Sequence, residues 1–461
     1  MIKLVRKRNL MKNKRIFKRK IYDKLLEWKK TYDGTYSVLI QGARRVGKST
    51  IAEEFAKNEY KSYIKVDFAH ITEDMLEIFR DISNLSLFFL RLQAETNVTL
   101  YERESVIIFD EIQLYPKVRQ AIKYLTADHR YDYIETGSLI SIKKNVKDIV
   151  IPSEEHKIDM FPMDYEEFLW AAGNPNYQLI KQLVDTGKPI GDSTNRKLMR
   201  DFRIYMAVGG MPQAVEAYVN GKNFAEIDAV KREIIELYKD NFRKIDPSGR
   251  ISKIFESIPS QLALKKKRFM ISRATGKKKI SKDEERLSDL IDSRTVLICY
   301  DVEDPSVSLS QTSRDDVFKL YLADTGLFTT LLFNDEESGN EDIYRKLLSD
   351  KLPENLGYLY ENAAAQILSA SGRKLYYHTW SSAEGIHYYE IDFLIVEKAK
   401  ISPIEIKSSR ISQHKSMDVF SDRYSHVINK KYLYSQHDIA KDGDIQLWPM
   451  YCMPVICHKN C

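Results

Sequence analysis

The chain is poor in cysteine and has no long apolar run. Four cysteines among 461 residues cannot supply the disulfide framework of a secreted scaffold. No apolar stretch approaches the roughly 20 residues that a membrane-spanning helix requires, and the first residues lack the apolar centre of a signal peptide. These absences predict a cytoplasmic protein with no membrane partner. Because hydrophobic residues still make up 43% of the chain, we expect several globular domains with sizeable cores.

Positive charge is concentrated at the start of the chain. The net charge is +6, yet residues 1–20 alone contain ten lysines or arginines and no acid. Subtracting those ten charges from +6 leaves −4 for the rest of the chain. The sequence therefore predicts a basic N-terminal extension but no overall basic surface for nucleic acid. Met11 is a second candidate for the start residue.

The strongest motif is a phosphate-binding loop. The apolar residues 38–40 predict a buried parallel strand, residues 42–49 give Gly-x-x-x-x-Gly-Lys-Ser, and a helical pattern follows. Glycines let backbone N–H groups turn toward phosphate oxygens, the lysine reaches the β- and γ-phosphates, and the serine hydroxyl ligates Mg²⁺. We expect ATP and Mg²⁺ to bind at Gly42, Ala43, Arg44, Arg45, Val46, Gly47, Lys48, Ser49 and Thr50.

Two acids follow the next buried strand and complete an ATPase pattern. Asp110 closes the strand formed by residues 105–110, where a second Mg²⁺ ligand is needed, and Glu111 is the residue type that polarises an attacking water. Adjacent acids also occur at solvated strand exits, so this assignment depends on the upstream loop. Ser138, at the tip of the following strand, is a candidate sensor of the γ-phosphate, although it also fits an ordinary turn. ATP hydrolysis is the predicted activity.

The order of the patterns predicts several domains. Strands alternate with helices up to about residue 163, which indicates a parallel α/β sheet. Residues 85–92 are apolar nearly all round and predict a buried helix. Helical periodicity then dominates until about residue 255. The predicted parts are 1–20 (basic extension), 21–163 (P-loop core), 164–250 (helical region), 251–342 (small winged-helix-like α+β unit) and 343–461 (C-terminal α/β domain).

Acids and a lysine share one face of a predicted hairpin near the C-terminus. Residues 388–396 and 402–407 predict two strands, and the two-residue period places Glu405 and Lys407 on one face, within reach of Asp392. Asp followed by Glu-x-Lys is the PD-(D/E)xK nuclease pattern, in which Asp392 and Glu405 would bind a divalent metal and Lys407 would stabilise negative charge. Glu361, on a preceding helix, is an additional candidate acid. The alternative is a charged edge hairpin without catalysis.

Further cysteines lie in the last ten residues. Cys452, Cys457, His458 and Cys461 are residue types that bind metals. Their spacing matches no common zinc pattern, so we expect a frayed segment with free thiols.

Five segments together resemble one prokaryotic family, the AAA-type ATPases fused to a C-terminal domain of unknown function. The resemblance implies an AAA+ core, a helical lid and a restriction-endonuclease-like C-terminal fold. Ser138 stands where the broader AAA+ pattern often has asparagine. Arg44, Arg45 and Arg130 are available as an arginine finger, and the sequence does not single one out. The segments are residues 42–49, 108–113, 135–138, 161–169 and 209–212.

Two functions are consistent with these patterns. The first is an ATP-driven protein that acts on DNA or RNA through a nuclease-like tail, and the lysine clusters at 265–268 and 277–279 favour it. The second is a nucleotide-gated switch that holds a protein partner through an inactive nuclease-like domain. The acidic stretch 281–291 favours the second. The oligomeric state is not predicted.

Overall fold

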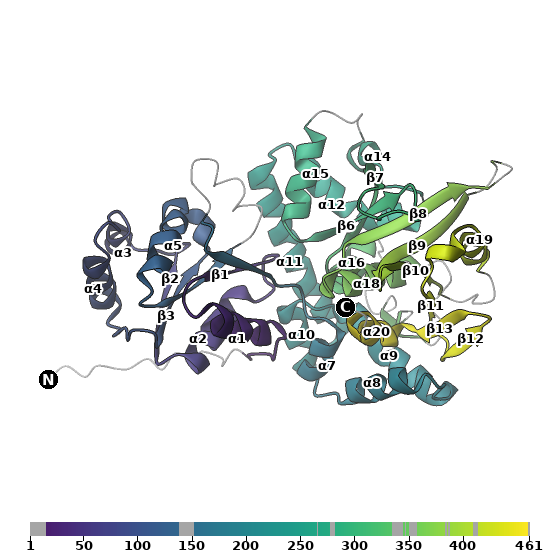
Figure 1. Ribbon diagram of the computed structural model, residues 1–461, viewed down its shortest axis with the longest axis horizontal. Coiled ribbons are helices and arrows are strands. Elements are labelled where there is room, and N and C mark those ends of the chain that lie inside the picture. Colours follow the sequence, from purple (N-terminus) through teal and green to yellow (C-terminus); the bar gives the residue numbers. More distant parts are fainter. Residues whose placement is uncertain are drawn as a thin grey trace.

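The computed structural model describes residues 15–137, 152–264, 266–276, 282–333, 344–345, 347–349, 357–382, 385, 388–408 and 414–459. A five-stranded sheet lies at one end of the molecule and an eight-stranded sheet at the other, with helices between them (Figure 1). Among the described residues, no helix is long and apolar enough to cross a membrane. The predicted sensor Ser138, the start residues Met1 and Met11, the lysine cluster 277–279 and Cys461 lie outside the described residues.

The first sheet is entirely parallel and confirms the predicted α/β class. Its order is β2-β3-β4-β1-β5, so the strand that carries the phosphate-binding loop lies inside the sheet. Every residue of β1, β3 and β4 is buried, as expected for strands covered by helices on both faces. The strands are β1 (Ser37–Gln41), β2 (Ser62–Asp67), β3 (Ser105–Asp110), β4 (Asp132–Gly137) and β5 (Glu155–Asp159).

Helices connect these strands and cover the sheet. They are α1 (Ile21–Tyr32), α2 (Lys48–Glu59), α3 (Glu73–Ile78), α4 (Leu85–Thr96) and α5 (Pro116–Asp128), with a short 3₁₀ turn at Ile112–Leu114. The prediction that residues 85–92 are buried all round is wrong. In α4, Leu87 and Leu90 are 42% and 63% exposed, because only one face of the helix contacts the sheet layer.

A helical region follows the first sheet. It begins with a capping box between Asp164 and Glu167, as predicted, and one expected helix over residues 251–262 is two helices, the second of which has Pro259 in its first turn. The helices are α7 (Tyr165–Ala171), α8 (Asn176–Thr186), α9 (Asp192–Val208), α10 (Pro212–Val219), α11 (Phe224–Ile245), α12 (Arg250–Glu256), α13 (Ile258–Ala263), α14 (Ile271–Thr275) and α15 (Asp283–Asp292).

The second sheet extends across the predicted boundary at residue 342. Its order is β12-β13-β11-β10-β9-β8-β6-β7, and β6 pairs in parallel with β8, so the strands of the small α+β unit belong to the C-terminal sheet. The predicted hairpin is present, with Ile404 opposite Phe393. The strands are β6 (Val296–Val302), β7 (Ser313–Leu322), β8 (Leu375–Ser381), β9 (Tyr388–Glu397), β10 (Lys400–Ile406), β11 (Lys431–Ser435), β12 (Ala440–Asp442) and β13 (Ile445–Pro449).

Four helices pack with this sheet, and its last residues are well buried. Cys452 and Cys457 are 0% and 1% exposed, so the expectation of a frayed segment is wrong for these residues. Their helix packs against α8 and α18, which supplies the apolar contacts that the sequence could not show. The helices are α16 (Thr325–Leu332), α18 (Gly357–Ala370), α19 (Lys415–Tyr424) and α20 (Met453–Lys459), with 3₁₀ turns at Ser425–Val427 and Met450–Cys452.

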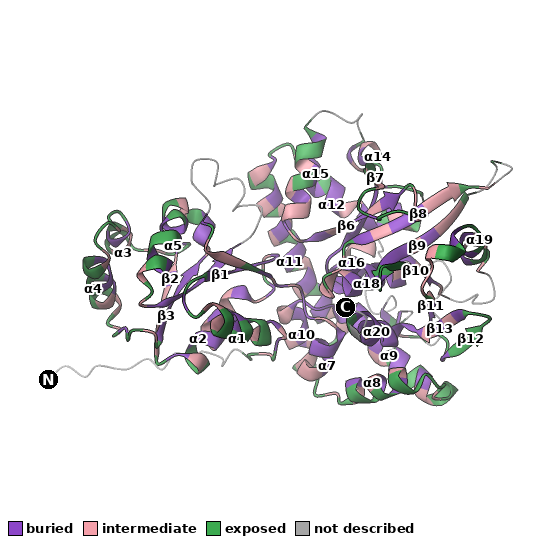
Figure 2. Ribbon diagram, viewed as in Figure 1, coloured by how far each residue is buried: buried purple, intermediate pink, exposed green. Residues whose placement is uncertain are grey.

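One hydrophobic cluster runs from the first sheet through the helices into the second sheet (Figure 2). The two halves meet closely at glycines. A Cβ on Gly210 would lie 2.1 Å from the Met163 carbonyl oxygen, and a Cβ on Gly326 would lie 2.3 Å from that of Val208. The Gly210 N–H donates to the Asp324 carboxylate at 2.6 Å. The turn before α10 is therefore fixed directly against the start of α16.

Candidate functional site

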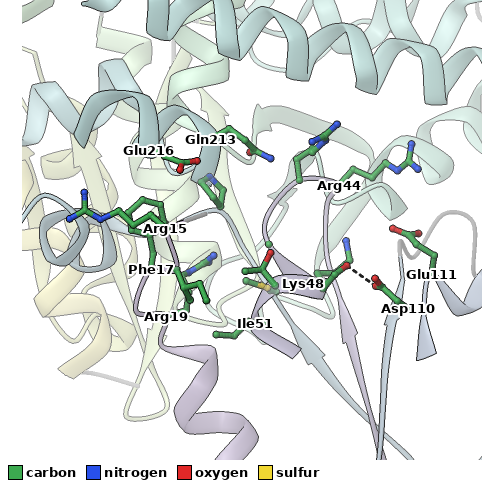
Figure 3. Close-up of a pocket in the computed structure, with 18 of the residues that line it drawn as sticks. Arg15, Phe17, Arg19, Arg44, Lys48, Ile51, Asp110, Glu111, Gln213 and Glu216 are labelled. Atoms are coloured by element: carbon green, nitrogen blue, oxygen red, sulfur yellow. Dashed lines mark hydrogen bonds between the residues drawn. The ribbon is translucent and has the colours of Figure 1, made fainter. Parts of the chain in front are cut away.

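The loop between β1 and α2 opens onto a cavity of about 390 Å³. The carboxyl end of β3 lines one end, and residues before α1 together with α10 line the other (Figure 3). The loop needs two of its glycines for steric reasons. A Cβ on Gly42 would lie 2.2 Å from the Met160 carbonyl oxygen, and Gly47 has a φ of +99°. This backbone leads directly into the N-terminus of α2, where anions are favoured.

Lys48 is a buried cation at the base of this cavity. Its Nζ donates to the carbonyl oxygens of Gly42 at 3.0 Å and Ala43 at 2.9 Å. Burial lowers the pKa of Lys48 to about 8, against the opposing effect of Glu111 and Asp110. Phosphate groups placed beside Nζ would stabilise the charged form, so the site suits a polyanion.

Ser49 and Asp110 form the oxygen-rich part of the site. The Ser49 hydroxyl donates to Asp110 Oδ1 at 2.6 Å, and Thr136 donates to the same oxygen. Lys65 Nζ lies 3.3 Å from Asp110 Oδ2. A carboxylate next to a hydroxyl is the ligand chemistry that Mg²⁺ uses together with nucleotide phosphates, so these residues fit the predicted metal.

Glu111 follows β3 in a left-handed backbone conformation, with φ of +55°. Its backbone N–H donates to Thr136 Oγ1 at 3.3 Å, and its carboxylate accepts from the Gln113 amide. Non-glycine residues in this conformation are uncommon and concentrate at functional sites. The turn places the Glu111 side chain at the cavity beside Asp110, where Figure 3 shows it near the loop.

The arginines of the loop contact other parts of the chain. Arg44 Nη1 donates to Asn241 Oδ1 at 2.7 Å, and the Tyr238 hydroxyl donates to the Arg44 carbonyl at 2.9 Å, so both contacts join the loop to α11. Arg45 lines the cavity and has a φ of +67°. Arg130 instead pairs with Asp128 at 2.6 Å.

Residues before α1 also belong to this site. Arg19, which the sequence analysis assigned to the basic extension, donates to the Val46 carbonyl at 2.9 Å and to the Phe161 carbonyl at 2.7 Å. Phe17 lines the far end of the cavity with Gln213 and Glu216 of α10 (Figure 3). The cavity therefore has a phosphate end with fixed charges and an end with an aromatic ring and polar side chains.

The C-terminal hairpin brings together the acids predicted from the sequence. Asp392 accepts from the Ile406 N–H at 2.7 Å, and Lys407 Nζ lies 3.1 Å from Glu405 Oε2. Glu405 is 1% exposed, and burial raises its pKa to about 7, with Asp392 acting in the same direction. Burial acts to lower the pKa of Lys407, but Glu405, Asp392 and Glu361 raise it above its ordinary value.

Two further residues enlarge this acid cluster. Lys319 of β7 donates to Glu390 Oε1 at 2.6 Å, and both side chains lie in the electrostatic field of Asp392. We define the acid cluster as Glu361, Glu390, Asp392 and Glu405, with Lys319 and Lys407. Within the described part of the chain, no three His, Cys, Asp or Glu side chains are already arranged to hold a metal ion.

Comparisons with known proteins separate the chain into parts. Residues 35–169 match the family model described as AAA domain. This segment is an AAA domain. Residues 199–338 and 356–453 match two models, each described as a domain of unknown function (DUF8612 and DUF4143). No curated protein matches the chain.

Solved structures give weaker likenesses. The Walker-type ATPase PABY2304 of Pyrococcus abyssi is 18% identical, with a TM-score of 0.41, and the match covers 68% of this chain and 96% of that one. Cdc6p of Pyrobaculum aerophilum is 12% identical, with a TM-score of 0.23, and the match covers 72% and 94%. At these values neither likeness informs the function of this chain.

The AAA domain also contains site residues that sequence reasoning missed. Thr136 and Lys65 contact Asp110 from the two strands that flank β3. Only the strand order makes them neighbours, and the sequence does not give that order. In the C-terminal sheet, Lys319 was missed for the same reason, because β7 is separated from β9 by 66 residues between Leu322 and Tyr388.

Proposed function

We propose that the protein binds Mg-ATP in the AAA domain and hydrolyses it. The observation that carries the proposal is the convergence of Lys48, Ser49, Asp110 and Glu111 on one cavity. The loop N–H groups and Lys48 would hold the phosphates, and Ser49 and Asp110 would hold Mg²⁺. The metal would neutralise charge on the phosphates. Glu111 would accept a hydrogen bond from the attacking water and orient it toward the γ-phosphate.

Helices outside the AAA domain would complete this site. Gln213 and Glu216 of α10 line the end of the cavity away from Asp110, and Leu237 of α11 lines it as well. Arg44 already bonds to Asn241 of α11 at 2.7 Å. In this proposal α10 and α11 act as the helical lid, so that nucleotide binding is felt by helices that belong to the rest of the molecule.

The test is ATP affinity, measured by isothermal titration calorimetry. Lys48→Ala removes the buried cation, and we expect the affinity for Mg-ATP to fall at least about 100-fold, which corresponds to about 3 kcal/mol. Lys57→Ala is the matched control, because Lys57 lies on the same helix but pairs with Glu53 on the surface. Unchanged affinity in Lys48→Ala would disprove the assignment.

A second activity, metal-dependent hydrolysis of phosphodiesters, is favoured by the acid cluster. Asp392, Glu405 and Lys407 converge on the hairpin, and Glu405 is buried. A divalent cation would relieve the repulsion between the two carboxylates and remove the cost of charging Glu405. Lys407 would then stabilise charge that develops on the phosphate. The alternative is an inactive fold that serves as a nucleotide-gated platform for a protein partner.

Thermal unfolding of the full chain with and without Mn²⁺ distinguishes these possibilities. We expect Mn²⁺ to raise the unfolding midpoint of the wild type and of Asp422→Asn, an exposed control on α19, but not that of Asp392→Asn. Cleavage of DNA or RNA that is lost in Lys407→Ala would support the nuclease. A midpoint shift without cleavage would favour the platform. No shift would leave a charged hairpin without a metal site.

A further inference from the structure

A basic groove lies beside the acid cluster. It has a volume of about 480 Å³ and is lined by Lys267, Arg268, Arg314, Thr379 and Ser381, with Trp380 at its side. None of its lining residues is acidic. Three cations and two hydroxyl groups therefore face a single hollow, although the C-terminal part of the chain carries no general excess of positive charge.

Two of these cations are available to a ligand. Lys267 and Arg268 are exposed, and within the described residues neither forms an ion pair with a carboxylate. Lys267 instead lies over the ring of Tyr388, with Nζ 4.4 Å from the centroid. The Tyr377 hydroxyl donates to the Lys267 carbonyl at 2.7 Å, so the backbone that carries this cation is fixed to the sheet.

The third cation is held in place by a buried acid. Arg314 pairs with Asp301, which is 0% exposed and also accepts from the Thr379 N–H at 3.0 Å and the Thr379 hydroxyl at 3.1 Å. The guanidinium of Arg314 remains 38% exposed. Asp315 follows Arg314 but acts on Tyr300, which is not among the residues that line the groove. The groove is therefore a built surface with oriented donors.

The groove continues along β9 into the acid cluster. Tyr388, Glu390 and Asp392 alternate along the strand and so share one face. Tyr388 lies under Lys267, and Glu390 is bonded to Lys319. The pKa of Tyr388 is raised, first by burial and then by Glu390, which shows that the ring and the acid are close. A strand that followed the groove would reach the acids within a few residues.

We propose that this groove binds the phosphodiester backbone of single-stranded nucleic acid. Cations that track a backbone beside exposed aromatic rings are the usual means of binding single strands without regard to sequence. Tyr388, at 38% exposure, and the half-buried Trp380 provide rings at the groove. Arginine and lysine hold phosphates through charge-assisted hydrogen bonds. The choice of nucleic acid over an acidic peptide rests on the second proposed activity, since only a phosphodiester would be cleaved by the neighbouring acids.

The test is fluorescence anisotropy of a labelled single-stranded oligonucleotide with the full chain, in EDTA and without ATP. Lys267→Glu/Arg268→Glu should weaken binding at least about 10-fold and reduce the dependence of log K on log[salt] by about two, one for each lost phosphate contact. Arg196→Glu/Lys197→Glu is the matched control, because it reverses the same two charges at exposed neighbouring positions on α9. We expect the control to bind like the wild type.

The milder pair Lys267→Gln/Arg268→Gln, expected to lose affinity by a smaller factor, guards against misfolding, and ATP affinity reports that the AAA domain remains intact. Equal losses in the groove and control variants would overturn the proposal, as would wild-type binding by the groove variants. Displacement of the oligonucleotide by polyglutamate at matched charge would assign the groove to acidic peptides instead. Asp392→Asn should retain binding, so a failure of metal-dependent cleavage and a failure of the groove give different results.

Discussion

The nucleotide cavity and the C-terminal acid cluster bury charges of opposite sign. In the first, burial lowers the pKa of Lys48 to about 8, and in the second, burial raises the pKa of Glu405 to about 7. In both sites the protein makes the charged form costly, and a ligand of the opposite charge would remove that cost. The comparison teaches that the sign of the expected ligand follows from which charge is buried: an anion for Lys48 and a cation for Glu405.

The two sites also differ in how they are assembled. Lys48 and Ser49 are neighbours in one loop, and the strand order brings Asp110 to them. The acid cluster draws on β7, β9, β10 and α18 together. A site made mainly from one loop is visible in the sequence, whereas a site made from several elements is visible only in part.

Glu111→Gln gives the largest expected effect and tests the chemistry of the first site. The amide keeps the size of the side chain but cannot polarise water, so we expect kcat for ATP hydrolysis to fall about 1000-fold. The affinity for Mg-ATP should stay within about twofold, because Lys48, Ser49 and Asp110 are untouched. Steady-state phosphate release and calorimetry measure the two quantities. Turnover at the wild-type rate would remove Glu111 from its proposed role.

The stability of the second site should depend on pH through Glu405. Because its folded-state pKa of about 7 exceeds the ordinary value of 4.5, the folded state binds the extra proton between these values. The contribution of Glu405 is therefore fully present below about pH 4.5 and is lost as the pH rises to about 7. The expected loss is about 2 to 3 kcal/mol.

Glu405→Gln should remove this part of the pH dependence, as measured by chemical unfolding at about pH 5 and about pH 8. Glu285→Gln is the control, since Glu285 is exposed on α15 and should leave the dependence unchanged. An identical pH dependence in wild type and Glu405→Gln would contradict the buried-anion side of the comparison.

The smallest expected effect concerns the proton on Lys48. Since the folded-state pKa is about 8, Lys48 loses its charge above that pH, and bound phosphates would restore it. Binding of ATP should therefore take up a proton, and affinity should fall by up to about tenfold per pH unit above about pH 8. Calorimetry in buffers of different ionisation enthalpy measures the proton. Lys48→Arg stays charged and should show a nearly flat profile, and proton release by the wild type would refute the prediction.

The sequence contained the fold of the AAA domain almost completely. The apolar strands before residues 42 and 111, the glycines of the loop and the capping box at Asp164 are local signals, and each is found in the structure. It did not contain the pairing of β6 with β8, because such long-range pairing depends on packing that no short pattern encodes. The boundary expected at residue 342 failed as a division between sheets for this reason.

The sites follow the same rule. Lys48, Ser49, Asp110, Asp392, Glu405 and Lys407 were predictable because their spacing carries the chemistry. Arg19 was not, because its two bonds to carbonyl oxygens depend on a docked segment that looks like part of a basic tail. Burial of Cys452 and Cys457 was missed because their partners on α8 and α18 lie far away in the sequence.

The packing of α9 against the second sheet has a consequence for synthesis on the ribosome. Asn195 bonds to the Gln436 carbonyl and to the Tyr451 hydroxyl, partners that follow it by 241 and 256 residues. At the usual rate of about 5 to 20 residues per second, α9 emerges roughly 10 to 50 seconds before these partners exist. During that interval the AAA domain can form its own sheet, while the surface of α9 that faces residues 436–451 stays uncovered and open to chaperones.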